Sequence, residues 1–179
     1  MTDIQPAREQ HPWTLPDLTA ATAPELFTLY GQVMAQLLSR GLIRTANAPA
    51  GDYAEFLVNR AVAGKLADNS EKSFDLVCEE FGRVQVKARV VSDPIKSSQR
   101  QTSPFRSDAF DNAAFVLLSS CDYHVVRATM VPMKAVAQAW VWREHVNGHI
   151  AFMRPALLDH PNAHDLTDRL RQAAQQEVR

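Results

Sequence analysis

The sequence predicts one α/β domain, built on a central mixed β-sheet with helices on both sides. Apolar and polar residues alternate from Arg83 to Val90, a period typical of a β-strand, within a predicted hairpin from about Phe74 to Val91. The run from Ala113 to Ser120 is almost wholly apolar, as expected of a central strand that is covered on both faces. Helical patterns precede and follow these strands, and 179 residues suffice for one such domain. We expect residues 1–21 to form a polar, proline-bearing arm and residues 22–179 to form the single domain.

Two helices are expected before the hairpin. The first runs from Pro24, which suits a first helical turn, to Gly41, which suits a C-terminal cap. Its apolar residues follow an i, i+1, i+4, i+7, i+8 pattern, which predicts one buried stripe. The stripe consists of Leu26, Phe27, Tyr30, Val33, Met34, Leu37 and Leu38. The second helix is expected to start near Asp52 and to bury Tyr53, Phe56, Leu57 and Ala61.

A long polar loop follows the hairpin, from Ser92 to Asp111. A loop of roughly 20 residues inside a compact domain is either functional or disordered. The elements expected after it are the strand 113–120, a strand from His124 to Val131, a helix from Pro132 to Trp140 or Trp142, a short strand from His149 to Met153, and a helix from Ala163 to Arg179. The last helix is expected to turn Leu166, Leu170 and either Ala173 or Ala174 inward.

The register of the hairpin decides which polar residues share a face. If Glu79 pairs with Arg83, a three-residue loop ends in Gly82, where a type I turn with a bulge needs a positive φ. That register places Asp75 opposite Lys87, on the same face. A two-residue turn would send Asp75 and Lys87 to opposite faces. The position of the glycine favours the first register.

An acid and a lysine on adjacent strands can hold a divalent metal and stabilise charge on a phosphate. The alternative is a cross-strand ion pair on a solvated face, a common arrangement that contributes little stability. Between the two strand positions, Gln85 offers a neutral oxygen and Val86 a backbone carbonyl. Glu55, near the start of the second helix, could supply a further negative charge. The alternative for Glu55 is a helix cap, because Asp52-x-x-Glu55 follows a capping-box spacing.

A second set of candidate residues consists of cations interleaved with hydroxyls and amides, the donors that proteins use on phosphate oxygens. The set consists of Lys96, Arg100 and Arg106 in the long loop, Arg89 on the polar face of the strand, and Lys72 just before Asp75. The alternative for the long loop is a mobile, solvated segment.

Composition narrows the function classes. The net charge of −1 does not by itself indicate a nucleic-acid partner. A local cluster of cations must therefore hold any anionic ligand. Cys78 and Cys121 are isolated, which favours free thiols in a reducing cytoplasm, and no Cys/His pair has zinc spacing. Trp140 and Trp142 are interpreted as packing residues rather than base-stacking ones. We expect no signal peptide and no span long enough to cross a membrane.

Taken together, Glu55, Asp75, Gln85 and Lys87 resemble the active-site pattern of the PD-(D/E)XK nuclease superfamily, in its Gln-x-Lys variant. The segments GDYAEFLV, NSEKSFD, VQVKARVV, SPFRS and VNGHI also resemble blocks of a family of small bacterial proteins, over about residues 24–170. The resemblance implies a restriction endonuclease-like fold, with three α/β/α layers around a central mixed β-sheet. Gln85 departs from the commoner acid at its position and implies a less charged site that holds one metal rather than two.

The resemblance also implies residue roles. Mg²⁺ (or Mn²⁺) would be held by Asp75, by Glu55 directly or through water, and by the Val86 carbonyl, while Lys87 would orient water or stabilise the phosphate. The function implied is a metal-dependent DNA endonuclease, with RNA as the alternative substrate. The near-neutral net charge favours a local site, a homodimer or a partner protein that delivers the nucleic acid. A second hypothesis is a catalytically silent member of the fold that binds nucleic acid or protein in a defence or repair system.

Overall fold

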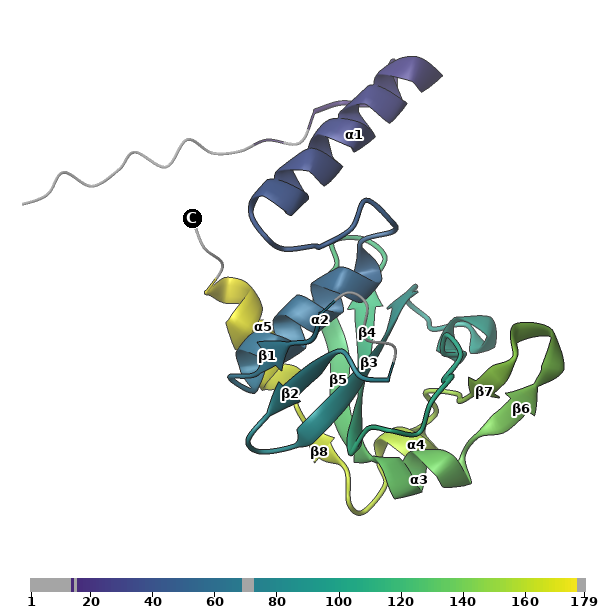
Figure 1. The fold of residues 1–179 in the computed structure, drawn as a ribbon. Helices are drawn as coiled ribbons and strands as arrows, with labels where there is room; N and C mark the ends of the chain where they lie inside the picture. Colours follow the sequence, from purple (N-terminus) through teal and green to yellow (C-terminus); the bar gives the residue numbers. More distant parts are fainter. Residues whose placement is uncertain (1–13, 15, 69–72, 177–179) are drawn as a thin grey trace, which may run out of the picture.

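The computed structural model describes residues 14, 16–68 and 73–176. Most of the predicted arm (residues 1–21), Lys72 and the predicted end of the last helix at residues 177–179 lie outside the described residues. The molecule is a mixed α/β structure around a six-stranded sheet of order β1-β2-β3-β4-β5-β8 (Figure 1). The neighbours β3 and β4 are parallel, whereas the other neighbours in this sheet are antiparallel. The prediction of an α/β structure with a central mixed sheet is therefore confirmed.

The sheet consists of β1 (Lys65–Leu66), β2 (Leu76–Cys78), β3 (Gly82–Val91), β4 (Asn112–Ser119), β5 (Val125–Pro132) and β8 (His164–Asp165). The predicted strands at 113–120 and 124–131 are confirmed as β4 and β5. β4 lies between β3 and β5, and its residues from Ala113 to Leu118 are at most 2% exposed. The apolar run therefore predicted a strand that is covered on both faces.

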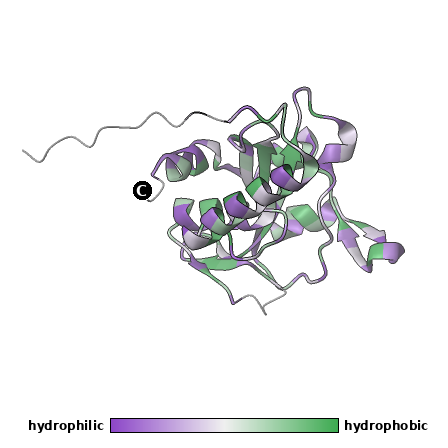
Figure 2. Cartoon of the chain, turned by 90° about the horizontal axis from the view of Figure 1, so that it is seen from above, coloured by the Kyte–Doolittle hydropathy of each residue, from purple (hydrophilic) through white to green (hydrophobic). Residues whose placement is uncertain are grey.

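Helices cover both faces of the sheet (Figure 1). On one face, α2 (Ala50–Ala61) and α5 (Thr167–Gln175) pack Leu57 and Leu170 against Val116 of β4. On the other face, Phe115 of β4 packs with α3 (Met133–Gln138), α4 (Pro155–Leu158) and the long loop. Figure 2 shows helices that carry both hydrophilic and hydrophobic residues around more hydrophobic strands. Two separate cores result, one on each side of β4.

The first helix, α1 (Ala23–Ser39), has the predicted ends but not the predicted packing. The Glu25 carboxylate accepts the Thr22 N–H at 2.8 Å, and Gly41 leaves the helix with a φ of +69°. However, α1 stands apart from the sheet in Figure 1, and Phe27 is 76% exposed. Of the predicted stripe, only Met34 is buried. The prediction of a buried stripe is wrong because the chain turns at Gly41 and buries Leu42 and Ile43 instead.

The second helix, α2, starts at Ala50 with Pro49 as its N-cap, not near Asp52. The Asp52 carboxylate accepts the backbone N–H groups of Arg44 and Thr45, at 2.8 and 2.7 Å, and so fixes the preceding connector. The capping-box alternative for Glu55 is therefore wrong. Of the four residues predicted to be buried, Leu57 is fully so, and Tyr53, Phe56 and Ala61 are partly buried.

The long loop is packed against the protein. It contains a 3-10 turn, η1 (Ser97–Arg100), and pairs through Gln101 with Phe152 and through Phe105 with His149. Thr102 and Phe105 are 2% and 1% exposed, which contradicts the alternative of a solvated loop. The prediction was incomplete because the partners of the loop lie about 50 residues further along the chain, a separation that local patterns do not reveal.

The C-terminal third differs most from expectation. The helix predicted from Pro132 ends at Gln138, and Trp142 lies instead in β6 (Val141–Arg143). The predicted strand at 149–153 is β7 (Gly148–Ile150). It pairs with β6 in a separate two-stranded sheet, and the 3-10 turn η2 (Glu144–Val146) connects the two strands. The last helix starts at Thr167 rather than Ala163, because His164–Asp165 pairs with β5. The inward positions Leu166, Leu170 and Ala173 are confirmed.

Candidate functional site

The hairpin pairs β2 with β3 in a register two positions from the predicted one. Leu76 faces Val84 and Cys78 faces Gly82, so Asp75 falls opposite Gln85 rather than Lys87. The predicted pairing of Glu79 with Arg83 is wrong because Gly82, with a φ of +65°, already belongs to the ladder. A Cβ at Gly82 would lie 2.6 Å from Asp111, whose carboxylate holds the Arg83 backbone N–H at 2.8 Å. Since the shift is even, Asp75, Gln85 and Lys87 still share one face of the sheet.

Asp75 is held from two directions just before β2 begins. Its carboxylate accepts the Val86 backbone N–H at 2.6 Å and a bond from Nε2 of Gln85. The Asp75 N–H donates in turn to the Val84 carbonyl at 2.9 Å. N–H and C=O of one strand residue point the same way, so the Val86 carbonyl also points to the Asp75 side of β3. A carboxylate and a backbone carbonyl oxygen therefore face the same edge, and Gln85 positions the carboxylate.

Glu55 lies across a small cavity from Asp75. The cavity has a volume of about 190 Å³ and is lined by Arg44, Thr45, Asp52, Glu55, Ala67, Asp68, Phe74 and Asp75. The second turn of α2 places Glu55 there, where it forms an ion pair with Arg44 and is 16% exposed. Arg44 also donates to the Ala67 carbonyl at 2.8 Å, so its guanidinium is fixed on both sides. We name this space the acid cavity.

The electrostatics of the acid cavity are those of carboxyl groups removed from water. Burial and the Asp75 charge raise the pKa of Glu55 to about 7, against the opposing effect of Arg44. Burial also raises the pKa of Asp75, although the Val86 N–H, Lys87 and Gln85 oppose the rise. Raised pKa values on neighbouring acids mean that the cavity favours additional positive charge.

Lys87 is buried, with 8% of its surface exposed. Its Nζ donates to the Pro104 carbonyl at 3.1 Å and lies 4.7 Å from the centre of the Phe105 ring. Burial lowers the pKa of Lys87, the charges of Asp75 and Glu55 oppose that change, and the nearby Arg106 charge adds to it. A buried lysine does not fit the alternative of a solvated surface ion pair. The loop therefore fixes the ammonium group, whose charge interacts with both acids.

The other predicted phosphate-binding cations divide into two groups. Arg89 donates to the Gln101 carbonyl, and Arg100 donates to the Met153 carbonyl at 2.9 Å, so both tie the loop to the body. Lys96 and Arg106 are exposed, and the charge of Arg106 contributes to the lowered pKa of Lys87. Lys72 lies outside the described residues. Of the five predicted cations, Arg106 is therefore the described one that combines exposure with a position near Lys87.

The donor set of the acid cavity fits a hard divalent cation. Asp75, Glu55 and the Val86 carbonyl offer oxygen ligands, which such ions prefer. Across the described ranges, no group of three or more His, Cys, Asp or Glu side chains forms a metal-binding cluster. An ion in this cavity would therefore depend on the backbone oxygen and on water to complete its ligands.

Sequence patterns did not identify Arg44, Pro104 or Phe105. Arg44 stands in an irregular connector eleven residues before Glu55, where no periodicity reveals its partner. The apolar pair Pro104-Phe105 inside a polar loop was the one available signal, since a phenylalanine there is more readily explained by packing than by solvation. The loop thus contributes its backbone oxygen and an aromatic ring to the lysine site.

Comparison with known proteins assigns no family, since no family model matches the chain and no curated protein matches it. None of the helices in the described part of the chain has the length and apolar character required to cross a membrane.

Proposed function

We propose that the chain is a Mg²⁺- or Mn²⁺-dependent phosphodiesterase that cleaves DNA internally, with a restriction endonuclease-like fold of the PD-(D/E)XK type. The order of elements supports this proposal. A helix carries Glu55, the following hairpin carries Asp75 and Gln-x-Lys, and helices cover both faces of the mixed sheet.

One observation carries the proposal: two carboxyl groups line one cavity, and a buried ammonium group interacts with the charges of both. The Asp75 carboxylate is fixed by Val86 and Gln85, while Glu55 lines the same cavity. Lys87 is held on the same face by the Pro104 carbonyl. Burying a lysine and two acids is costly, so a fold retains them more readily for chemistry than for stability.

In this proposal Asp75, Glu55 and the Val86 carbonyl would hold the metal ion. A divalent ion there supplies Lewis-acid charge for the phosphate and lowers the pKa of bound water. Lys87 stabilises the negative charge that builds up on the phosphate, and its fixed position avoids reorganisation during the reaction. Gln85 orients Asp75. Arg44 neutralises Glu55, so a bound cation would share Glu55 with Arg44 or displace it.

The direct test incubates the protein with plasmid, single-stranded and branched DNA, and with RNA, in the presence of Mg²⁺ or Mn²⁺. Lys87→Met keeps the buried volume and Asp75→Asn keeps an acceptor for the Val86 N–H, so both variants should fold. We expect metal-dependent cleavage that falls by about 100-fold or more in each variant. Lys65→Ala, an exposed lysine on the edge strand β1, is the matched control and should retain wild-type cleavage.

A catalytically silent binding or interaction module is the alternative function. Absence of cleavage on every substrate, with DNA binding retained in Lys87→Met and Asp75→Asn, would favour it over the nuclease. Cleavage that persists in both variants would exclude the acid cavity as the active site.

We further propose a homodimer in the cytoplasm. The near-neutral net charge of −1 disfavours tight binding through one copy alone, since phosphate neutralisation provides most non-specific affinity. The exposed stripe on α1, with Phe27, Tyr30 and Val33 at 76%, 52% and 48%, is a surface that a second copy could cover. The free thiols of Cys78 and Cys121 suit a reducing compartment. Sedimentation of the wild type and of Val33→Glu tests the dimer, which the charge should dissociate.

A further inference from the structure

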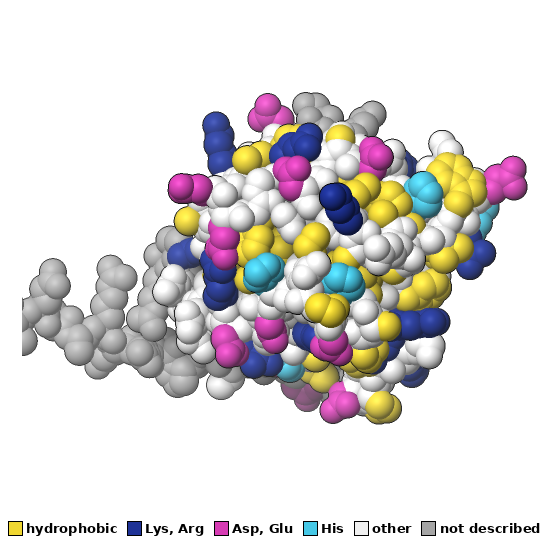
Figure 3. Space-filling model, turned by 90° about the horizontal axis from the view of Figure 1, so that it is seen from below, with side chains coloured by type: hydrophobic (Ala, Val, Ile, Leu, Met, Phe, Trp, Pro, Cys, Tyr) yellow, Lys and Arg dark blue, Asp and Glu magenta, His cyan; other side chains and the backbone are white. Residues whose placement is uncertain are grey.

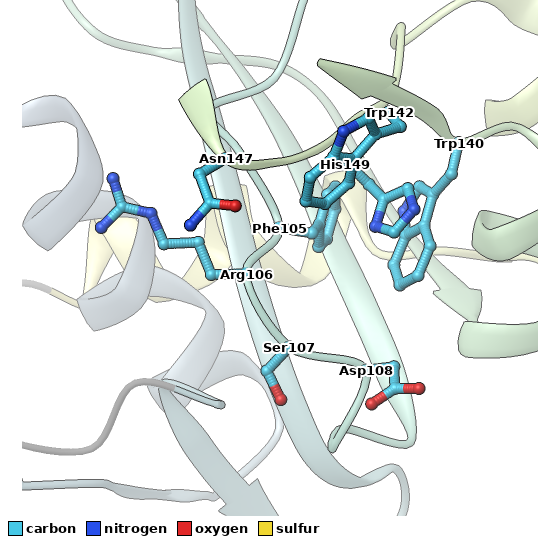
Figure 4. A pocket seen from close by; sticks show the side chains of 8 residues that line it. All are labelled: Phe105, Arg106, Ser107, Asp108, Trp140, Trp142, Asn147 and His149. Carbon is cyan, nitrogen blue, oxygen red and sulfur yellow. The ribbon is translucent and has the colours of Figure 1, made fainter. Parts of the chain in front are cut away.

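A second hollow lies on the side of the loop that faces the β6–β7 hairpin (Figure 4). It has a volume of about 300 Å³ and is lined by Phe105, Arg106, Ser107, Asp108, Trp140, Trp142, Asn147 and His149. We name it the aromatic pocket. Its volume is at the lower end of the range for small-molecule sites.

The rings of the pocket form a continuous cluster of contacts. His149 stacks on Trp140 with ring centres 4.7 Å apart and an angle of 16° between the planes. Trp142 meets His149 edge-on at 5.1 Å, and Trp140 packs on Phe105 at 5.4 Å. Trp140 packs against the core, in agreement with its interpretation as a packing residue, whereas Trp142 is 52% exposed. Figure 3 shows hydrophobic and histidine side chains gathered at the right edge, where Figure 1 places β6 and β7.

The backbone fixes the pocket before any ligand arrives. Phe105 and His149 exchange two hydrogen bonds, of 2.7 and 2.9 Å, and so lock the loop to β7. Exposed aromatic rings on a rigid ladder lose little conformational entropy on binding, which suits them to flat ligands.

The charges at the rim distinguish the two ends of the pocket. In Figure 4 the Arg106 guanidinium extends away from the aromatic rings, while Asp108 lies on the other side of the pocket. A guanidinium binds phosphate, whereas carboxylate and amide groups accept hydrogen bonds from base amino groups. The pocket therefore offers a flat aromatic surface, acceptors for a base edge and a separate cation for a phosphate.

Phe105 lines this pocket and also contacts Lys87. The Lys87 ammonium lies 4.7 Å from the centre of the Phe105 ring, and the Trp140 ring also packs on Phe105. Arg106, the next residue of the loop, also lines the aromatic pocket. The Phe105 ring is thus shared by the lysine site and the aromatic pocket.

We infer that the aromatic pocket binds an unpaired nucleobase of the substrate strand, stacked on Trp142, with the adjoining phosphate at Arg106. This inference rests on the proposed function for the identity of the ligand, and it specifies the substrate class as single-stranded or locally unpaired nucleic acid. A base inside a fully paired duplex cannot reach a ring in a pocket without leaving its stack.

The test measures binding in EDTA, so that cleavage does not contribute. Three labelled probes of roughly 12 nucleotides are compared by fluorescence anisotropy: a single strand, its full duplex, and a strand of abasic residues with the same phosphates. We expect the single strand to bind more tightly than both other probes. Trp142→Ala should weaken binding of the single strand by roughly 5- to 100-fold, and Trp142→Phe by less, because a ring is retained.

The controls separate stacking from loss of the hairpin. Val141→Ala changes the neighbouring residue of β6, which is 40% exposed and does not line the pocket, so its binding should equal that of the wild type. Binding of the abasic strand should not respond to Trp142→Ala, whereas Arg106→Ala should weaken binding of both strands. Equal binding of the single strand by the wild type and Trp142→Ala, or equal loss with the abasic strand, would overturn the inference.

The failure of this inference is distinguishable from failure of the proposed nuclease function. Cleavage that depends on Lys87 without any effect of Trp142 on single-strand affinity refutes the pocket and leaves the nuclease. A base-dependent effect of Trp142 without cleavage on any substrate refutes the nuclease and leaves the pocket.

Discussion

At the residue scale, Glu55 combines burial with a like charge nearby. Its ion pair with Arg44 favours the ionised form, yet burial and Asp75 outweigh that effect and raise its pKa to about 7. A cation placed between Glu55 and Asp75 would offset both the cost of burying the Glu55 charge and its repulsion by Asp75. The protonation of Glu55 and the binding of a metal ion should therefore compete.

The first prediction is that Mg²⁺ affinity rises with pH up to about 7 and then levels, because Glu55 must lose its proton to become a ligand. Without metal, the folded state holds this proton more tightly than the ordinary value of 4.5 allows. The Glu55 contribution to the unfolding free energy therefore falls as pH rises from 4.5 to about 7. Thermal melts with and without Mg²⁺ across this range measure both effects. A Mg²⁺-induced change in Tm that is the same at pH 5.5 and pH 8, within about 1 °C, would contradict the prediction.

The matched control is Glu55→Gln, which keeps the size of the side chain and removes its proton equilibrium. Its Mg²⁺-induced change in Tm should be smaller than that of the wild type above pH 7, and it should not change near the Glu55 pKa of about 7. A Glu55→Gln protein that keeps the pH profile of the wild type would assign the titration to another group.

The second prediction concerns Gln85, whose Nε2 donates to the Asp75 carboxylate. Gln85→Glu replaces that donor with a second carboxylate, so the metal-free protein should lose about 1–3 kcal/mol of unfolding free energy. Added Mg²⁺ should then stabilise the variant more than it stabilises the wild type, because one more charged oxygen faces the ion. Gln85→Ala, the control, should lose the hydrogen bond without the larger Mg²⁺ effect. Denaturant titrations with EDTA and with Mg²⁺ make the comparison, and equal Mg²⁺ effects in all three proteins would contradict it.

At the element scale, α1 is a helix whose apolar side, apart from Met34, is left largely exposed by the described residues. The third prediction is that Phe27→Ala changes the unfolding free energy of the monomer by no more than about 0.5 kcal/mol, because Phe27 is 76% exposed. Leu57→Ala, in the fully buried face of α2, should cost about 2–5 kcal/mol. Urea unfolding, at a concentration where sedimentation shows a monomer, measures both. A cost above about 2 kcal/mol for Phe27→Ala would mean that α1 packs on the body in solution.

The elements also differ in how far the sequence predicts them. The β2–β3 hairpin, β4 and β5 were predicted because their signals, alternation and continuous apolar runs, are contained within the strands themselves. The short strands β1, β6 and β8 were missed, since a strand of two or three residues has no measurable period. Pro24 and Gly41 predicted the ends of α1 to within two residues, but periodicity did not predict its burial. An apolar stripe shows which side of a helix avoids water, not which surface covers it.

In the candidate site, too, residues within strands were predicted and residues in irregular segments were not. Asp75 and Lys87 share a face under both the predicted and the observed register, because both leave an odd number of residues in the turn. Their neighbours could not be predicted this way. Arg44 and Phe105 reach the site from irregular segments, and the contacts of Phe105 depend on a pairing with His149. The strand residues of a site are thus more predictable than the loop residues that hold them.

At the scale of the whole molecule, the loop from Ser92 to Asp111 lines the aromatic pocket, contacts Lys87 and packs Phe105 and Phe110 into the core on the α3 and α4 side of the sheet. The Pro104 carbonyl holds Lys87, and the Phe105 ring lies between Lys87 and Trp140. The backbone of Phe105 pairs with β7 on the far side. The position of the lysine therefore depends on how closely β7 approaches the loop.

Gly148, at the start of β7, permits this close approach. A Cβ at position 148 would lie 2.8 Å from the Phe105 carbonyl oxygen and 3.0 Å from Cβ of Pro104. A carbonyl oxygen of the backbone cannot turn aside as a flexible side chain can, so the loop or the hairpin must shift. Either shift would move the Pro104 carbonyl or the Phe105 ring relative to Lys87.

The fourth prediction is that Gly148→Ala lowers the unfolding free energy by about 1–3 kcal/mol and lowers cleavage by roughly 10- to 100-fold, although residue 148 lines neither cavity. Gly31→Ala is the control, since a Cβ there meets nothing within 4 Å and alanine favours the interior of α1. Thermal melts and cleavage rates, measured at a temperature where both variants remain folded, separate lost stability from lost positioning. If Gly148→Ala keeps wild-type cleavage and stability, the position of Lys87 does not depend on how closely β7 approaches the loop. A loss of stability alone would limit the role of the loop to packing.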